Sequence, residues 1–239
     1  EKGSFFRAGQ TVIRQGVNLE LVHVGLAAEV GASHVLAIAP PRVSIITTGN
    51  ELVPSCQTPA GGQIRNTNGP MLSAAVASCG AEPIPMGIAS DHPEPLRALI
   101  AQGLAADILL LSGGVSTGDY DIVPKTLENI GVECVFHKVC LKPGKPIWFG
   151  VLQRPAASPT LVFGLPGNPV STLVCFELFV RPALEKISGK SFIPKDRDQQ
   201  TARLTNSVQG SLDRPVYHPC QLEVGKSGLL AKTLPWGGS

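Results

Sequence analysis

Apolar and polar positions in the middle of the chain alternate between short aliphatic runs and longer amphipathic stretches. The aliphatic runs are bounded by glycine, proline or aspartate, as is typical of β-strands, and they cover residues 42–49, 82–87, 107–114, 132–139 and 160–167. The stretches with helical periodicity cover residues 69–80, 91–105, 121–131 and 168–189. This repeated strand–helix alternation predicts an α/β fold with a mostly parallel sheet that helices cover on both faces.

The two flanks follow different patterns. Before residue 41, the segments 10–16 and 33–39 read as strands around a helix over 18–31, capped by Asn18. Some forty residues are too few for a core of their own, so we expect the remnant of a larger linker domain. After residue 189, strand patterns alternate with turns, which predicts a small, incomplete all-β domain. The predicted domains are residues 1–40, 41–189 and 190–239.

Five loops rich in glycine, proline and polar residues each follow a predicted strand. They are TTGNEL (47–52), ASDHPEP (89–95), SGGVSTGDYD (112–121), CLKPGKP (140–146) and GLPGNPVS (164–171). In parallel α/β sheets, ligands bind beyond the carboxyl ends of the strands. The five loops therefore predict one binding site at one edge of the sheet.

The loop that begins at Ser112 has the residues of an anion site. Gly113, Gly114 and Ser116 offer exposed N–H and hydroxyl groups at a strand end, and the helix that follows adds the positive end of its dipole. A tight turn with no ligand is the alternative. In the last loop, Asn168 is predicted to cap the helix that follows, as Asn68 is for the helix over 69–80.

Charged side chains on the same loops suggest the chemistry of the ligand. The carboxylates are Glu51, Asp91, Asp119 and Asp121, and the cations are Lys138, Lys142 and Lys145. Carboxylates beside a phosphate suit Mg²⁺, although helix capping alone would explain some of the aspartates. The lysines would attract an anion, or would form a solvated surface.

Composition excludes several other classes of protein. The 20 basic and 18 acidic residues are scattered and leave a net charge of +2, which predicts no nucleic-acid or membrane partner. The N-terminal sequence lacks a signal-peptide pattern, so we place the protein in the cytoplasm. The cysteines and histidines have no zinc-ligand spacing, and the G-x-G-x-x-G and P-loop motifs are absent. The residues alone thus indicate a phosphate-bearing or oxyanionic ligand, with Mg²⁺.

In this order and at these separations, TTGNEL, SGGVSTGDYD, KPGKP and GLPGNPVS are similar to motifs of the molybdopterin molybdenumtransferase family, the MoeA type that includes the C-terminal part of gephyrin. The resemblance implies that residues 41–189 form a molybdopterin-binding, three-layer α/β domain. It implies an enzyme of molybdenum cofactor biosynthesis that joins molybdate to adenylylated molybdopterin and cleaves the adenylate in a Mg²⁺-dependent step. It also implies a homodimer and contact with the molybdopterin adenylyltransferase.

The resemblance assigns roles to individual residues. The catalytic residues that it implies are Glu51, Asp91, Asp121, Lys138 and Lys142. Asp121 and Asp119 would hold Mg²⁺. The residues implied for binding molybdopterin and molybdate are Ser112, Gly113, Gly114, Ser116, Lys142, Lys145, Pro146, Pro166, Gly167 and Asn168.

Two departures from the family pattern qualify these expectations. No segment of the chain matches the domain that the family inserts in its N-terminal region, so we expect a truncated fragment. Pro219 stands where the family commonly has an arginine near the molybdate site, and Arg214 or His218 is the candidate replacement. Arg214 is preferred because it is charged at every physiological pH. The alternatives are a non-catalytic molybdopterin-binding or scaffold module and a related pterin or nucleotide hydrolase.

Overall fold

A six-stranded sheet forms the centre of the computed structural model, which describes residues 5–115, 122–155, 157–189, 201–208, 210, 213–226 and 228–235. Its strands are β1 (Arg42–Thr48), β4 (Glu82–Ala89), β5 (Ile108–Ser112), β6 (Glu133–His137), β7 (Trp148–Leu152) and β8 (Thr160–Leu165). Their order is β4-β1-β5-β8-β7-β6. The α/β fold with a mostly parallel sheet is thereby confirmed.

One strand of this sheet, β7, was not predicted. It pairs antiparallel with both β8 and β6, whereas β4, β1, β5 and β8 pair in parallel. Because β6 and β8 both run opposite to β7, the carboxyl end of β6 lies at the same edge of the sheet as those of the four parallel strands. The connection between β6 and β7 includes residues 140–146, the loop with Lys142 and Lys145 that we call the lysine loop. This connection therefore brings the lysine loop to the predicted binding edge.

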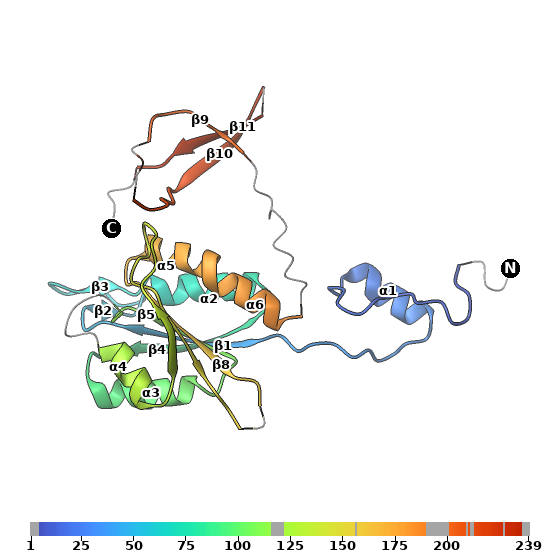
Figure 1. Ribbon diagram of the computed structural model, residues 1–239, viewed down its shortest axis with the longest axis horizontal. Coiled ribbons are helices and arrows are strands. Elements are labelled where there is room, and N and C mark those ends of the chain that lie inside the picture. Colours follow the sequence, from blue (N-terminus) through green and yellow to red (C-terminus); the bar gives the residue numbers. More distant parts are fainter. Residues whose placement is uncertain are drawn as a thin grey trace.

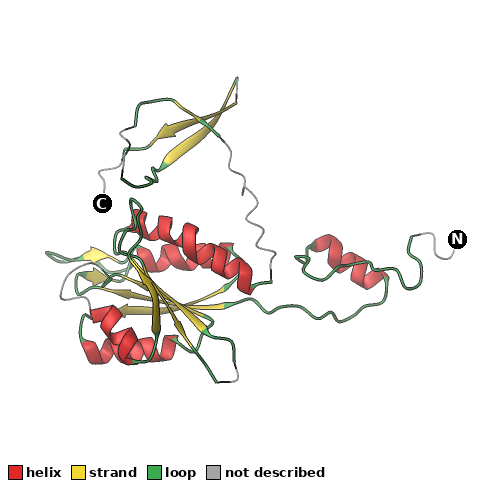
Figure 2. Cartoon of the chain, in the orientation of Figure 1, coloured by secondary structure: helices red, strands yellow, loops and turns green. Residues whose placement is uncertain are grey.

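Helices cover both faces of the sheet, as the alternation predicts (Figures 1 and 2). The helices are α2 (Asn68–Ser78), α3 (Pro93–Gly103), α4 (Ile122–Asn129), α5 (Pro169–Cys175) and α6 (Arg181–Ile187). Helices α2, α5 and α6 lie on one face, and α3 and α4 on the other. A π-helical turn, η1 (Phe176–Val180), joins α5 to α6 where a single helix was predicted. Pro182, which has no N–H, follows at the start of α6, so the regular hydrogen-bond ladder cannot continue there.

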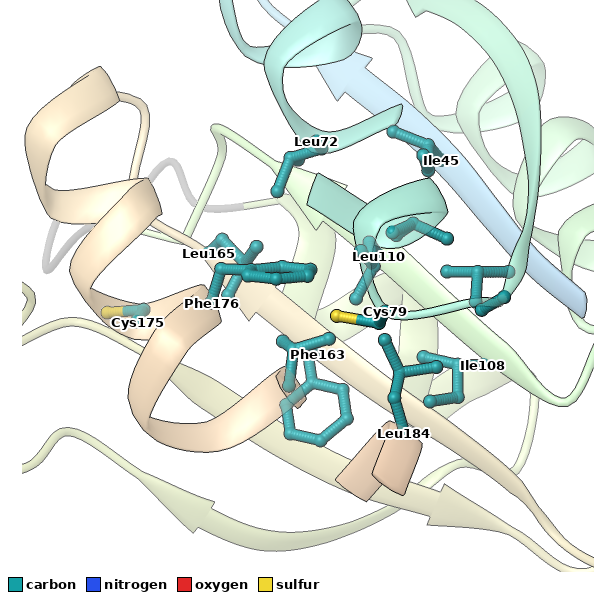
Figure 3. Packing of buried hydrophobic residues seen from close by; sticks show 14 of the residues in the cluster. Ile45, Leu72, Cys79, Ile108, Leu110, Phe163, Leu165, Cys175, Phe176 and Leu184 are labelled. Carbon is teal, nitrogen blue, oxygen red and sulfur yellow. The ribbon is translucent and has the colours of Figure 1, made fainter. Parts of the chain in front are cut away.

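The apolar strands supply two cores because successive side chains of a strand point to opposite faces. Ile45 and Leu110 pack with α2 and the η1 residue Phe176 in one cluster, which Figure 3 shows from close by. Ile46 and Leu109 pack in the other cluster, with α3 and α4. Burial on both faces explains why these strands have continuous aliphatic runs.

The N-terminal segment contains one described helix, α1 (Leu21–Glu29), and none of its residues is buried. The strands predicted at 10–16 and 33–39 were wrong, since no strand is formed among residues 5–40. Neither segment has a neighbouring strand to accept its backbone hydrogen bonds, so local propensity was not enough. The predicted cap was also wrong: α1 begins after Glu20, which forms a capping box with His23.

The small β-structure predicted for the C-terminal segment is formed, as a separate three-stranded sheet whose order is β10-β11-β9 (Figure 1). Its strands are β9 (Arg203–Leu204), β10 (Cys220–Gly225) and β11 (Gly228–Thr233). Two short strands, β2 (Leu52–Val53) and β3 (Ile64–Arg65), pair in parallel beside the central sheet. Among the helices that the structure describes, none is long and apolar enough to cross a membrane.

Candidate functional site

A cleft of about 940 Å³ opens at the carboxyl edge of the central sheet. Its wall includes these residues of the predicted site: Glu51, Asp91, Ser112, Gly113, Gly114, Lys142, Lys145, Pro146, Pro166, Gly167 and Asn168. Lys138 is exposed and does not belong to this wall. Ser116, Asp119 and Asp121 lie outside the described residues. The fold thus brings residues from all five predicted loops to one cleft.

Gly113 and Gly114 remain without side chains because the protein itself occupies the space beside them. A Cβ at Gly113, where φ is +97°, would lie 2.5 Å from the carbonyl oxygen of Thr48. A Cβ at Gly114 would lie 2.7 Å from a methyl carbon of Val123 in α4. The turn after β5 therefore needs glycine to pack against the end of β1, whether or not a ligand approaches it.

The acidic side of the cleft is held by two loops that contact each other. The Asn50 N–H donates to Asp91 Oδ2 at 3.1 Å, and the Asp91 N–H donates to Asn50 Oδ1 at 3.1 Å. Asp91 does not cap α3, whose N-cap residue His92 makes no side-chain cap bond. The carboxylate of Glu51 lies over Gly49, where a Cβ would be 2.7 Å from either carboxylate oxygen. The Asp91 carboxylate is therefore held at the cleft by the Asn50 N–H and not by helix capping, and the Glu51 carboxylate lies beside Gly49.

The lysine loop on the opposite side is held from two directions. The Lys142 N–H donates to Pro215 O at 3.0 Å, and the Tyr217 N–H donates to Lys142 O at 2.8 Å, so the C-terminal segment docks on this loop. From below, the thiol of Cys175 in α5 donates to Gly144 O at 3.5 Å. Burial raises the pKa of this thiol to about 12. Lys142 is half-buried, and Lys145 is exposed.

Asn68 and Ser112 meet at the floor of the cleft. Asn68 Nδ2 donates to Ser112 Oγ at 2.7 Å and to Gly167 O at 2.8 Å. The Ser112 hydroxyl donates in turn to Pro166 O at 3.3 Å. The hydroxyl of Ser112 is therefore engaged within the protein. The predicted capping role of Asn68 was wrong, because Asn68 is already helical and the Gly69 N–H bonds to Asn66 Oδ1.

Three buried side-chain atoms have no hydrogen-bond partner among the described residues, and all three belong to the wall of this cleft. They are Thr48 Oγ1, Asn68 Oδ1 and Arg214 Nε. Arg214 Nε does lie 3.8 Å from Asp213 Oδ2, at ion-pair distance. Buried polar atoms are almost always hydrogen-bonded in native proteins. Their gathering in one cleft indicates a place where a ligand supplies the missing partners.

Part of the cleft wall was not predicted from the sequence. Residues 64–68, which comprise β3 and its connection to the start of α2, line the cleft, and Arg65 adds a cation there. The polar run RNTN after a short strand was the available signal, although nothing in it specified which edge of the sheet it would reach. Asn168 does cap α5, as predicted: its Oδ1 accepts from the Val170 and Ser171 N–H groups at 3.0 and 3.3 Å.

Comparison with known proteins gives concordant matches. Residues 44–186 match the family model described as "Probable molybdopterin binding domain". The chain is 38% identical over 189 residues to a molybdopterin molybdenumtransferase of Nostoc sp., which covers 79% of this chain and 43% of that protein. It is 35% identical over 253 residues to gephyrin of Dictyostelium discoideum, which covers 93% of this chain and 35% of that protein.

Solved structures give the same result. A molybdopterin biosynthesis MoeA protein from Pyrococcus horikosii superposes with a TM-score of 0.76 at 33% identity, over 94% of this chain and 53% of that one. A second MoeA structure, from Pyrococcus horikoshii OT3, gives a TM-score of 0.70 at 26% identity, over 99% of this chain and 55% of that one. The chain spans less than half the length of the curated relatives it matches.

Proposed function

Because the chain belongs to the molybdopterin-binding domain family and is of the MoeA type, we propose that it acts in molybdenum cofactor biosynthesis as part of a molybdopterin molybdenumtransferase. The reaction joins molybdate to the dithiolene of adenylylated molybdopterin and releases the adenylate. The observation that carries this proposal is the gathering of three unpartnered buried polar atoms in the wall of one cleft. A cleft of about 940 Å³ also has room for a ligand of nucleotide size.

The cations of the cleft would bind the anionic parts of the substrates. Lys142 and Lys145 stand on the lysine loop, and Arg65 and Arg214 approach from two other segments. Their ammonium and guanidinium groups would stabilise the charge that develops on the phosphates during adenylate cleavage. Because the backbone of Lys142 is hydrogen-bonded on both sides, its position requires little reorganisation. Lys138 lies away from the cleft wall, so its catalytic role stays a prediction.

The carboxylates on the opposite side would hold or orient a cation. Glu51 and Asp91 are hard oxygen donors of the kind that Mg²⁺ prefers. Within the described residues, no three His, Cys, Asp or Glu side chains gather closely enough to hold a metal ion. We therefore propose that Asp119 and Asp121, which lie outside the described residues, complete the donor set. Bound Mg²⁺ would neutralise phosphate charge during cleavage.

Arg214 is the donor that we propose in place of an arginine at position 219. It lines the cleft, and its Nε has no hydrogen-bond partner among the described residues. Pro219 does not belong to the cleft wall, and its carbonyl accepts from the Leu234 N–H at 2.9 Å. A guanidinium group binds tetrahedral oxyanions well because its N–H groups form a planar fork.

We also propose a homodimer and contact with the molybdopterin adenylyltransferase, in the cytoplasm. Support for a dimer comes from the exposed apolar side chains of α1, among them Leu21, Val22 and Val24. Apolar surface of this kind is typical of protein–protein contacts. Light scattering of the purified protein would measure its mass in solution, and a monomeric mass would contradict the dimer.

Calorimetry with molybdopterin and with its adenylate, each with and without Mg²⁺, tests the proposed function. We expect both to bind, and Mg²⁺ to strengthen binding of the adenylate. Asp121→Asn should weaken the Mg²⁺ dependence and leave the melting temperature unchanged, because it removes a charge and keeps the shape. Equal Mg²⁺ dependence in the variant would exclude this role for Asp121. Binding without any turnover in the full-length enzyme would favour the scaffold alternative.

A further inference from the structure

The orientation of the Asn68 side-chain amide is fixed by its neighbours. Asn68 is the first residue of α2 and is only 9% exposed. Its Nδ2 group donates to Gly167 O, and a carbonyl oxygen can only accept, so the nitrogen must face Gly167. The Ser112 hydroxyl gives its own hydrogen to Pro166 O and therefore accepts from Asn68. Turning the amide over would break the bond to Gly167 O, and Ser112 could bond the amide oxygen only by giving up its bond to Pro166 O.

The fixed orientation leaves Asn68 Oδ1 as a permanent acceptor with no donor. It is buried and has no hydrogen-bond partner among the described residues. The start of α2 does not use it, because the Gly69 N–H bonds to Asn66 Oδ1 at 3.0 Å. An unsatisfied buried acceptor is costly. A ligand that brings a hydrogen-bond donor to this position would remove that cost.

The chemistry of an acceptor selects among the parts of the proposed ligand. Molybdate and the phosphate groups are rich in negative oxygen, which a carbonyl oxygen repels. A pterin ring carries N–H donors, and its exocyclic nitrogen keeps at least one hydrogen in every neutral tautomer, whereas each ring nitrogen can lose its own. The acceptor is thus complementary to the amino edge of the ring.

We propose that Asn68 is a specificity-determining residue of the cleft, whose Oδ1 accepts a hydrogen bond from the exocyclic amino group of the pterin. This inference rests on the proposed function, since it assigns one edge of the molybdopterin ligand to one atom of the cleft. The Nδ2 bonds to Ser112 and Gly167 position the amide, so that Oδ1 can accept the hydrogen bond from the ligand. A site built to bond a polar group discriminates strongly against an analogue that lacks it.

The test compares two probes that differ at that group. 6-Hydroxymethylpterin carries the amino group, and 6-hydroxymethyllumazine carries an oxygen there instead. By fluorescence or calorimetry, we expect the wild-type chain to bind the pterin at least about tenfold more tightly. Asn68→Leu, which is similar in size and has no acceptor, should bind the two probes within about twofold of each other. If Asn68→Leu fails to fold, as judged by its melting curve, Asn68→Ala carries the same expectation.

The outcomes separate this inference from the proposed function. If the wild-type chain binds molybdopterin but binds the two probes equally, the role of Asn68 is overturned and the proposed function is not. Preference for the pterin that persists in the Asn68 variants would also overturn it, and would leave Asn68 as a link between α2 and the loop at Gly167. If molybdopterin itself does not bind, the proposed function fails, and the inference fails with it.

Discussion

The two edges of the central sheet differ in how their polar groups are hydrogen-bonded. At the amino edge, Asp107 Oδ2 accepts from the Arg42 N–H at 2.8 Å, and the Thr160 hydroxyl lies 3.0 Å from Ala106 O. At the carboxyl edge, Thr48 Oγ1, Asn68 Oδ1 and Arg214 Nε have no hydrogen-bond partner among the described residues, and all three belong to residues that line one cleft. The polar groups named at the first edge bond to one another, whereas those at the second lack partners among the described residues, as in a site that binds a ligand.

The glycines of the two edges differ in the same way. Gly131, before β6, has φ of +95° and open space where a Cβ would be. Gly113, after β5, has nearly the same φ, +97°, but the end of β1 occupies that space. The comparison shows that the turn after β5 packs closely against the end of β1, although polar atoms nearby have no partner among the described residues. Such rigidity holds binding groups in place before the ligand arrives.

The largest expected effect comes from alanine at the two matched glycines. Gly131→Ala should lower the free energy of unfolding by about 1–2 kcal/mol, the cost of a side chain at positive φ. Gly113→Ala should cost more than about 3 kcal/mol, because the added methyl also displaces Thr48. Urea denaturation followed by circular dichroism measures both. Equal losses in the two variants would contradict the packing explanation.

The next effect concerns the lysine loop. Lys142→Ala and Lys145→Ala should each weaken binding of the molybdopterin adenylate by about 1–2 kcal/mol, the scale of a charge-assisted hydrogen bond. Lys186→Ala, at the exposed end of α6, is the control and should leave the affinity unchanged. Isothermal titration calorimetry gives the three affinities. Unchanged binding in both loop variants would mean that these lysines are only solvated.

A smaller effect is expected at Arg214, the contribution of the C-terminal segment to the cleft. Arg214→Ala should weaken molybdate binding by about 1 kcal/mol. The effect is small because the nearby Asp213 carboxylate partly neutralises the charge of the guanidinium group. Pro219→Arg should restore binding only if position 219 reaches the anion. The measurement is a titration with molybdate of a protein that contains all the domains of the family. No loss with Arg214→Ala and no gain with Pro219→Arg would exclude this segment from the molybdate site.

The smallest effect concerns Cys175, whose thiol contacts the lysine loop. We expect it to make the free energy of unfolding depend on pH. Burial raises the pKa of its thiol to about 12 from 9.0, so the unfolded state loses the proton first as the pH rises. The stability that this thiol contributes is complete below pH 9 and is lost between about pH 9 and 12. Between pH 8 and 9.5 the loss should be about 0.8 kcal/mol.

Cys175→Ser is the matched control, because a serine hydroxyl does not titrate in this range. Its free energy of unfolding, measured by urea denaturation at pH 8 and 9.5, should fall less than that of the wild-type chain. An identical decrease in both proteins would show that other groups account for the alkaline dependence.

The sequence by itself determined five of the six strands of the central sheet, the helices that cover it and the loops that meet at its carboxyl edge, but not β7. These features depend on local periodicity: the run at residues 107–114 reads as a buried strand wherever it folds, and Asn168 caps its helix through neighbours two and three residues away. Glu51, Asp91 and Lys142 could be assigned to one site because parallel strands place their ends together.

Only the tertiary structure decided the contacts that link distant segments. Asn68 looked like a helix cap, yet its amide bonds Gly167, 99 residues away. Arg214 reaches the cleft because Lys142 pairs with the backbone of residues 215 and 217, and the predicted strands at 10–16 and 33–39 did not form. Hydrogen-bond partners far apart in the sequence leave no local pattern, since they are chosen by packing after the elements have formed.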